Sequence, residues 1–313
     1  MNARLGGPRP FHFNTYDKPG ATIVRVTFEN PINNYYIKIK RPQTCLNPNG
    51  ASIVDGLQRE YIHLRMLHEI GLRGISLPRP LLLDLGALIL VTSEVPGQSV
   101  LRKYSQLARI FPRDQRHLAY DLPQIGRALD ILHRSDIPAH AVHPAQYADQ
   151  FRKNISDPIL ALPPRLLDSL HDFAHRIEDR ISQLRPVRTC HNDFATHNIL
   201  ISERGVGVVD FESLAINSPH RDFSTLYVSL NDFLVFAPSR RIRLAKLWSS
   251  FCIGYGQPIS LDQMRPFLIH HLVNHLLDLT VRRDTTTSFA ARFFFSQLIR
   301  LNFGLVTDLL PND

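Results

Sequence analysis

The sequence predicts an α+β protein with two lobes, a small strand-rich lobe followed by a larger, mainly helical one. The chain has 313 residues, which is more than one hydrophobic core usually holds. Its first 95 residues contain runs that alternate as β-strands do, whereas most of 98–185 and 220–310 has helical periodicity. We place the boundary near residue 96, so that the expected lobes are 1–96 and 97–313.

Three elements are predicted in the first lobe. "TIVRVTFE" (22–29) and "NYYIKIK" (34–40) flank a short stretch with Pro and Asn, which predicts a hairpin. Apolar residues recur at helical spacing in 50–72, so this segment is expected to be the one helix of the lobe. "ALILVTSEV" (87–95) is typical of a buried strand, and "PGQS" (96–99) of a turn.

The second lobe is expected to be helical, with breaks marked by proline near 112, 138, 158, 163–164 and 186. The exception is 199–212, where two short apolar runs are separated by "SERG". These runs predict a small hairpin of Ile199–Ile201 and Val206–Val209.

Charge, cysteine content and the absence of certain sequence patterns limit the kinds of function that we expect. The net charge is +8, which favours anionic partners such as nucleotides and phosphates. The cysteines Cys45, Cys190 and Cys252 form no CxxC pair, so neither a disulfide framework nor a zinc site is indicated. The N-terminus lacks the apolar run of a signal peptide, no segment is apolar enough for a transmembrane helix, and no basic run is interleaved with aromatics as nucleic-acid binding requires. We therefore expect a cytoplasmic protein.

A cluster of polar side chains in "CHNDFATHNILI" (190–201) indicates a metal site. The predicted hairpin brings Asn198 and Asp210 close together, because paired strands lie only about 5 Å apart. One amide and one carboxylate, with room for phosphate oxygens and water, suit Mg²⁺. Asp193 is left as a nearby carboxylate that can orient a hydroxyl and accept its proton.

The first lobe offers a cation for phosphate binding. Lys38 and Lys40 alternate with isoleucines, so both lysines lie on one face of their strand, and one of them can reach a nucleotide. Glu60, near the start of the following helix, can hold that lysine in place. The alternative is that the lysines line a solvated edge strand and Glu60 a solvated helix face.

The motifs in this order resemble the aminoglycoside phosphotransferase (phosphotransferase enzyme) family. "HNDFATHN" matches the pattern His-x-Asp-x-x-x-x-Asn, and "VVDFE" matches the metal-binding segment of that family. "YYIKIK", "LQREYIHLRML", "LILVTSEVPGQSV", "IGRALDILH" and "SPHRDFSTL" are also similar to family segments, so that the resemblance covers roughly residues 20–255. It implies a protein-kinase-like bilobal fold and the use of ATP with Mg²⁺.

The resemblance also implies roles for individual residues. Asp193 would be the catalytic base, and Asn198 and Asp210 would hold Mg²⁺. Lys38, rather than Lys40, would contact the α- and β-phosphates, with Glu60 as its ion-pair partner.

Other residues would bind adenine or support the loop. Glu94 and Val95 would contact adenine through backbone groups at the hinge, and Leu200 and Val209 would form the floor of the adenine pocket. His191 and Asp222 would brace the catalytic loop.

The sequence departs from the family in two places. Position 192 is Asn where Gly is common, and the first hairpin turn, "ENPINN", has no glycine to grip a triphosphate. The segment between Asp210 and Asp222 is too short for the activation segment of a regulated protein kinase.

Three further patterns have ordinary structural interpretations. His270, His271 and His275 lack the glutamate of a zinc-protease motif and are expected on a helix surface or in the core. The apolar face of 291–306 is expected to pack on other helices, with a weak peripheral membrane contact as the alternative. The basic run 239–246 is expected to be a solvated helix start, with a surface for an anionic substrate as the alternative.

Together these observations predict an ATP-dependent small-molecule kinase that transfers the γ-phosphoryl group to a hydroxyl of a sugar, glycan precursor, antibiotic or similar alcohol. Residues 223–313 contain few acidic side chains, which favours a neutral or anionic alcohol over a polycationic one. The alternatives are a catalytically weak nucleotide-binding scaffold and a protein kinase.

Overall fold

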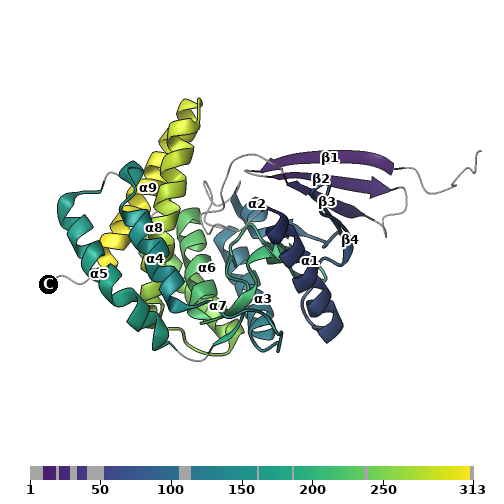
Figure 1. Ribbon diagram of the computed structural model, residues 1–313, viewed down its shortest axis with the longest axis horizontal. Helices are drawn as coiled ribbons and strands as arrows, with labels where there is room; N and C mark the ends of the chain where they lie inside the picture. Colours follow the sequence, from purple (N-terminus) through teal and green to yellow (C-terminus); the bar gives the residue numbers. More distant parts are fainter. Residues whose placement is uncertain are drawn as a thin grey trace, which may run out of the picture.

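The computed structural model describes residues 10–18, 21–28, 34–40, 53–105, 114–160, 162–184, 187–235 and 239–310. An antiparallel sheet with one helix forms the N-terminal side of the molecule, and a group of helices forms the C-terminal side (Figure 1). This arrangement confirms the predicted α+β class. No helix among the described residues is both long and apolar enough to cross a membrane.

The N-terminal sheet has five antiparallel strands in the order β1-β2-β3-β5-β4. Their bounds are β1 Pro10–Lys18, β2 Ala21–Phe28, β3 Tyr35–Lys40, β4 Pro80–Asp84 and β5 Ile89–Ser93. Strands β2 and β3 confirm the predicted hairpin, although its turn lies outside the described residues. In β3, Lys38 is opposite Ile23 of β2 and Leu90 of β5, so a central strand carries the lysine. The pattern analysis did not predict β1.

Helix α1 (Ile53–Ile70) confirms the helix expected over 50–72. It buries Leu57, Leu64 and Leu67 completely, as their i, i+7, i+10 spacing on one face requires. The loop after it is anchored to the C-terminal half, because Ser76 N–H donates to the Val206 carbonyl at 2.9 Å.

The segment "PGQS" is more than the predicted turn. Residues Gln98–Ser99 form a short strand, β6, which pairs with β8 (Ile199–Ser202), and helix α2 (Val100–Ser105) follows at once. Gly97 has φ +126°, and a Cβ at this position would overlap the Ile201 backbone. A glycine therefore allows the chain to cross between the two halves close to β8.

The C-terminal half is mainly helical, as predicted. Its longer helices are α3 Asp114–His133, α4 Pro144–Ile155, α5 Pro164–Ser182, α6 His220–Phe233, α7 Arg240–Tyr255, α8 Leu261–Thr285 and α9 Phe289–Leu309, with short 3₁₀ helices η2 Pro158–Leu160 and η3 Phe211–Ser213. Prolines mark the starts of η2 and α5, but Pro123 and Pro266 lie inside α3 and α8. The breaks expected near 112 and 186 lie outside the described residues.

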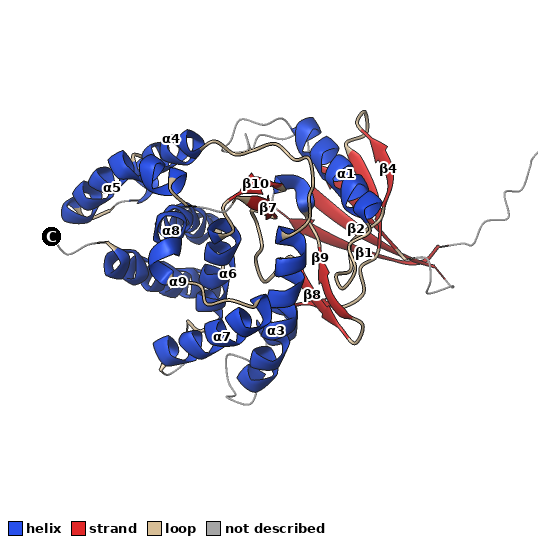
Figure 2. Cartoon of the chain, turned by 90° about the horizontal axis from the view of Figure 1, so that it is seen from below, coloured by secondary structure: helices blue, strands red, loops and turns tan. Residues whose placement is uncertain are grey.

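Two pairs of short strands lie between the sheet and the helices (Figure 2). Strands β8 and β9 (Gly205–Val208) confirm the predicted hairpin, with β9 ending one residue before Val209. Strands β7 (Arg188–Cys190) and β10 (Ala215–Asn217) form a second antiparallel pair that pattern analysis did not predict. The polar cluster, residues 190–201, begins at the last residue of β7 and ends within β8, so it connects the two strand pairs.

The structure bears on two further surface predictions. Helix α9 packs on α8 through Leu298 and Leu301 against Leu279, as predicted for its apolar face, whereas Phe293 of the same segment is 53% exposed. At the start of α7, Arg241 and Lys246 are exposed, so this basic run is a solvated helix start. Arg241 pairs with Asp308 of α9 at 2.5 Å.

Candidate active site

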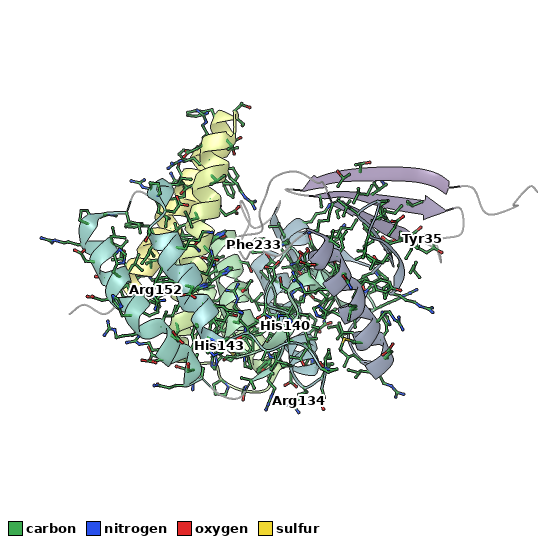
Figure 3. The ribbon with its side chains drawn as sticks, in the orientation of Figure 1. Tyr35, Arg134, His140, His143, Arg152 and Phe233 are labelled. Carbon is green, nitrogen blue, oxygen red and sulfur yellow. The ribbon has the colours of Figure 1, made fainter. Side chains whose placement is uncertain are left out.

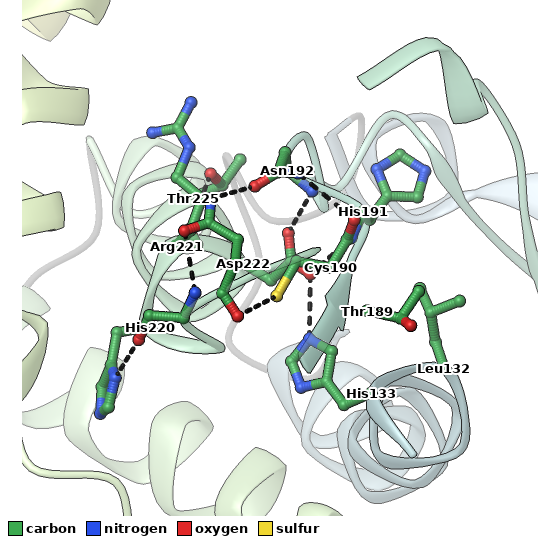
Figure 4. Close-up of polar contacts among 12 residues, drawn as sticks. Leu132, His133, Thr189, Cys190, His191, Asn192, His220, Arg221, Asp222 and Thr225 are labelled. Carbon is green, nitrogen blue, oxygen red and sulfur yellow. Dashed lines mark hydrogen bonds and ion pairs between the residues drawn. The ribbon is translucent and has the colours of Figure 1, made fainter. Parts of the chain in front are cut away.

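The loop that follows β7 is held in place by the carboxylate of Asp222. This fully buried side chain accepts the backbone N–H groups of His191 at 2.8 Å and Asn192 at 2.6 Å. His133 of α3 contacts the same carboxylate through Nε2 at 3.0 Å (Figure 4). The other ring nitrogen of His133 contacts the Tyr255 hydroxyl at 2.9 Å. A buried carboxylate with three N–H donors is well satisfied, and it fixes the backbone direction of the loop.

Asn192 has the left-handed backbone conformation, with φ +62°. This conformation explains why glycine suits the position, and asparagine is among the residues that tolerate it best. Its amide donates to the Ser213 carbonyl at 2.8 Å and accepts from Asn217 at 2.6 Å. The departure from glycine therefore adds hydrogen bonds between the loop and the segment around β10.

Asp193 and Asn198 contact each other across this loop. Asn198 Nδ2 donates to the Asp193 carboxylate at 2.9 Å and to its backbone carbonyl at 3.0 Å. Desolvation in the pocket raises the pKa of Asp193 above its ordinary value, although one side of the carboxylate remains accessible, and nearby His197, His191 and Arg221 act in the opposite direction. A carboxylate in this state is suited to accept a proton.

Lys38 lies between two carboxylates. One belongs to Glu60, its predicted ion-pair partner, and the other to Asp210, a predicted metal ligand. Its ammonium is 2.7 Å from Glu60 of α1 and 2.8 Å from Asp210, 172 residues away. Burial alone would lower the pKa of Lys38, but Asp210, Glu60 and Glu212 raise it well above its ordinary value. The lysine therefore stays charged, and the alternative of a solvated lysine on an edge strand is wrong.

Glu212 is a charged residue of the site that sequence reasoning missed. Its carboxylate binds Lys40 at 2.8 Å and lies 3.6 Å from Lys38. Gly56 of α1 faces it so closely that a Cβ there would overlap the carboxylate. The sequence offered one indication of its role: Glu212 follows Asp210 by two residues within "VVDFE". An acid so close to Asp210 can also reach Lys38 and Lys40, which lie on one face of their strand.

One face of α1 contacts the segment that carries Asp210. Gly56, Glu60 and His63 follow the i, i+4, i+7 spacing of a helix face. The ring of His63 donates through Nδ1 to the Phe211 carbonyl at 2.8 Å, and burial lowers the pKa of this histidine. On the other side, His191 donates through Nε2 to the Val209 carbonyl at 3.0 Å. Asp210, with φ +70°, is thus held on both flanks.

The oxygen atoms around Asp210 fit a magnesium ion. Asn198 uses its amide nitrogen for Asp193, and its buried amide oxygen has no hydrogen-bond partner among the described residues. A buried acceptor without a donor is costly unless a cation or water satisfies it. The Val209 N–H donates to the Asn198 carbonyl at 3.0 Å, which places Asn198 beside the residue that precedes Asp210. One amide oxygen and nearby carboxylates are the ligands that Mg²⁺ accepts.

A cavity of about 470 Å³ lies where the two halves of the chain meet near the predicted hinge. It is lined by Arg25, Asn34, Glu94, Pro96, Gly97, Ser202, Glu203 and Arg204. Glu94 pairs with Arg25 at 2.7 Å, and its N–H donates to the Asn34 carbonyl at 2.9 Å. Val95, Leu200 and Val209 do not line this cavity. Val95 is buried against Gly207, and Gly207 is opposite Leu200 in the β8–β9 pair.

A second cavity, also of about 470 Å³, opens beside Asp193 and extends between α6, α8 and α9. Its wall includes Arg221, Asp232, Phe233, His271 and His275, and Phe233 lies on the side of the helices that faces the sheet (Figure 3). Sequence reasoning expected these histidines on a helix surface or in the core. His270 is indeed buried in the core, but His271 and His275, four residues apart on α8, line the cavity.

Comparison with known proteins agrees with this geometry. The model of the phosphotransferase enzyme family matches residues 20–266. No curated protein sequence matches the chain significantly.

Solved structures share the fold at low sequence identity. A choline/ethanolamine kinase family protein from Mesorhizobium loti has a TM-score of 0.62 and 16% identity, covering 98% of this chain and 92% of that chain. The aminoglycoside phosphotransferase APH(3'')-Id from Streptomyces rimosus has a TM-score of 0.60 and 18% identity, with coverage of 85% and 91%. Amicoumacin kinase hAmiN, in complex with AMP-PNP, Ca²⁺ and Ami, has a TM-score of 0.61 and 15% identity, with coverage of 97% and 91%.

These proteins have the protein-kinase-like fold that the motifs imply, and the family match extends over most of the chain. The chain belongs to the phosphotransferase enzyme family.

Proposed function

We propose that the protein is an ATP-dependent kinase that phosphorylates a hydroxyl group of a small molecule in the cytoplasm. The observation that carries the proposal is the meeting of Lys38 from the sheet, Glu60 from α1 and Asp210 from the C-terminal half, next to the Asp193–Asn198 pair. In this proposal residues 1–96 form the nucleotide-binding lobe, and residues 97–313 form the catalytic and acceptor-binding lobe.

Asp193 acts as the catalytic base. Its carboxylate lies on the wall of the second cavity, where an acceptor hydroxyl can approach it, and Asn198 keeps it oriented. Asn198 and Asp210 would hold Mg²⁺ through their side-chain oxygens, and the ion would supply positive charge for the phosphoryl group in transfer. Most of the catalytic effect then comes from positioning and from preorganised charges.

Lys38 contacts the α- and β-phosphates, and Glu60 holds its ammonium in place. The adenosine part of ATP binds at the hinge, where the cavity beside Glu94 receives part of it. We assign the backbone of Glu94 and Val95, and the side chains of Leu200 and Val209, to the adenine site, although Val95, Leu200 and Val209 lie outside that cavity. The support for this placement is the cavity lined by Glu94, Pro96 and Gly97 on the sheet side of the site.

A small-molecule acceptor fits the second cavity, because its volume of about 470 Å³ is in the range of small-ligand sites. The relatives are named as kinases of choline or ethanolamine, of aminoglycosides and of amicoumacin. The competing function is a nucleotide-binding scaffold with little catalysis. The intact set of Asp193, Asn198 and Asp210 favours the enzyme.

The test is ADP release from Mg·ATP over a panel of alcohols, sugars and hydroxylated antibiotics, with the variants Asp193→Asn and Asp210→Asn. We expect turnover with at least one acceptor, and a loss of about a hundredfold or more in either variant because each removes a charged group that the transition state needs. Nucleotide binding should persist in Asp193→Asn and weaken in Asp210→Asn. A protein that binds Mg·ATP but turns over nothing faster than water would support the scaffold.

A further inference from the structure

The second cavity places one positive charge without a carboxylate partner beside the candidate base. Arg221, at the start of α6, lines the cavity together with Asp193, and its charge opposes the rise in the pKa of that carboxyl that desolvation causes. Its side chain points away from the donors that surround Asp222 (Figure 4). The contact that the structure shows for its guanidinium is His271 Nδ1 at 3.4 Å, and no ion pair joins Arg221 to an acid among the described residues.

His271 does not neutralise this charge. Burial, together with Arg221, His275 and His270, lowers the pKa of His271 well below its ordinary value, so the ring is neutral. Because a guanidinium only donates, Nδ1 of His271 accepts and its proton is on Nε2. The pair therefore presents a net positive charge and only donors to the cavity.

The acids of the cavity other than Asp193 are already paired. Asp232 accepts from His275 at 2.6 Å and from Asn302 at 2.9 Å. Burial opposes protonation of His275, but Asp232 raises the pKa of this histidine above its ordinary value. Asp278 pairs with Arg282 at 2.8 Å. Apart from Asp193, the candidate base itself, a cationic acceptor would have to displace one of these partners to reach a carboxylate, whereas an anion finds Arg221 without a carboxylate partner among the described residues.

We propose that the acceptor is an alcohol carrying an anionic group, a carboxylate or a phosphate, and that Arg221 binds this group beside Asp193. Guanidinium groups bind both anions through paired hydrogen bonds with a defined geometry. The inference rests on the proposed function, since it assigns the acceptor of the same reaction.

The test compares alcohols that differ only in the charge of one group. One series is glucose, glucuronate, glucose 6-phosphate and 6-amino-6-deoxyglucose; the other is glycerol, glycerate, glycerol 3-phosphate and 3-aminopropane-1,2-diol. Two scaffolds sample two distances between hydroxyl and charge. Binding is measured by calorimetry in the presence of Mg²⁺ and a non-hydrolysable ATP analogue, and turnover is measured separately by ADP release.

In at least one series, we expect the anionic members to bind at least about tenfold more tightly than the neutral member, because the anionic group gains a charged hydrogen bond with Arg221. The ammonium member should bind most weakly. The carboxylate and phosphate arms show which anion the site prefers. Arg221→Gln should remove this preference and raise KM for the anionic acceptor, with much smaller effects on the neutral one. Arg221→Lys should keep part of the preference, because it keeps the charge but loses the paired geometry.

Arg176→Gln is the matched control, since Arg176 is an exposed arginine on α5 away from both cavities. Its removal changes the net charge equally and should leave the preference intact. Thermal unfolding of each variant checks that the fold is retained.

The proposal is overturned if, in both series, the neutral or ammonium member binds as tightly as the anionic members or more tightly. It is also overturned if no anionic member binds detectably. A uniform fall in kcat with every acceptor in Arg221→Gln overturns it too, since that result would place the arginine on the transferred phosphoryl group. If Mg·ATP is bound and hydrolysed while the charge preference is absent, the acceptor inference alone fails. If Mg·ATP is not bound, the proposed function fails.

Discussion

Lys38 shows how one contact decides between two equivalent residues. Lys38 and Lys40 lie on the same strand face, and periodicity does not distinguish them. The structure places Lys38 against both Glu60 and Asp210, whereas Lys40 contacts Glu212. Lys38 is thus the lysine closest to the candidate metal ligand, and Lys40 orients a neighbouring acid.

The substitutions Lys38→Met and Lys40→Met should therefore differ. We expect Lys38→Met to lower kcat/KM by about a hundredfold or more, as the loss of one preorganised charge at the phosphates does, and Lys40→Met to lower it by about tenfold or less. Steady-state ADP release measures both values, with Lys38→Arg as the variant that keeps the charge. Equal losses in the two methionine variants would contradict the assignment.

Asn192 combines a special backbone conformation with buried side-chain hydrogen bonds. Asn192→Gly keeps the conformation but removes the hydrogen bonds to the Ser213 carbonyl and from the Asn217 amide. Asn192→Ala loses the same bonds and in addition strains the left-handed backbone by about 1–2 kcal/mol. We expect thermal stability to fall in the order wild type, Gly, Ala. A Gly variant as stable as the wild type would mean that the side-chain bonds contribute nothing.

At the scale of elements, helices α3 and α7 pack closely against each other at two glycines. Gly126 of α3 faces the backbone of Phe251 and Tyr255, and Gly254 of α7 faces the backbone of Pro123, so closely that a Cβ on either glycine would overlap. The same pair brings His133 and Tyr255 together beneath Asp222. The packing of α3 on α7 thus positions the side chains that hold Asp222, and Asp222 in turn holds the loop that carries Asp193.

Gly126→Ala should destabilise the protein by about 1–3 kcal/mol, because the added methyl forces the helices apart. Gly304→Ala in α9 is the matched control. Its Cβ meets no atom within 4 Å, so the change should stabilise the helix by about 0.5–1 kcal/mol. Denaturant unfolding measures both values. A Gly126→Ala protein as stable as the wild type would show that the helices separate at no cost.

At the scale of the whole molecule, the site joins the two halves of the chain. Lys38 of the sheet binds Asp210, Ser76 after α1 exchanges backbone hydrogen bonds with β9, and His63 of α1 contacts the Phe211 carbonyl. A ligand held by both halves stabilises the folded chain by mass action, by about 2.7 kcal/mol at a concentration of one hundred times Kd.

Mg·ATP should therefore raise the unfolding temperature, and ATP with EDTA should raise it much less. Asp210→Asn should reduce the difference between the two conditions, because the variant loses a charged oxygen ligand for the ion. Differential scanning fluorimetry over a nucleotide titration provides the measurement. If magnesium makes no difference to the wild-type shift, Asn198 and Asp210 do not form the metal site.

Short segments of the sequence were sufficient to predict the local features of the fold. Alternation and helical spacing predicted β2, β3, α1 and the β8–β9 hairpin, and the five-residue spacing of Asp193 and Asn198 placed them in one loop, where the structure joins them by a hydrogen bond. Strand β1 and the β7–β10 pair were not predicted, because the alternation in β1 extends only over Phe11 to Asn14 and the other two strands have only three residues each.

Contacts between residues that are far apart in the sequence became visible only in the folded chain. The contact of Lys38 with Asp210 spans 172 residues, and that of His133 with Asp222 spans 89. Arg221, His271 and His275 carry no signal of their own in a single sequence, because a charged or imidazole side chain on a helix looks the same whether it faces solvent or a cavity. For Glu212 the sequence offers only its position two residues after Asp210. Packing of α1 on the Asp210 segment, and of α6 on α8, turned them toward the site.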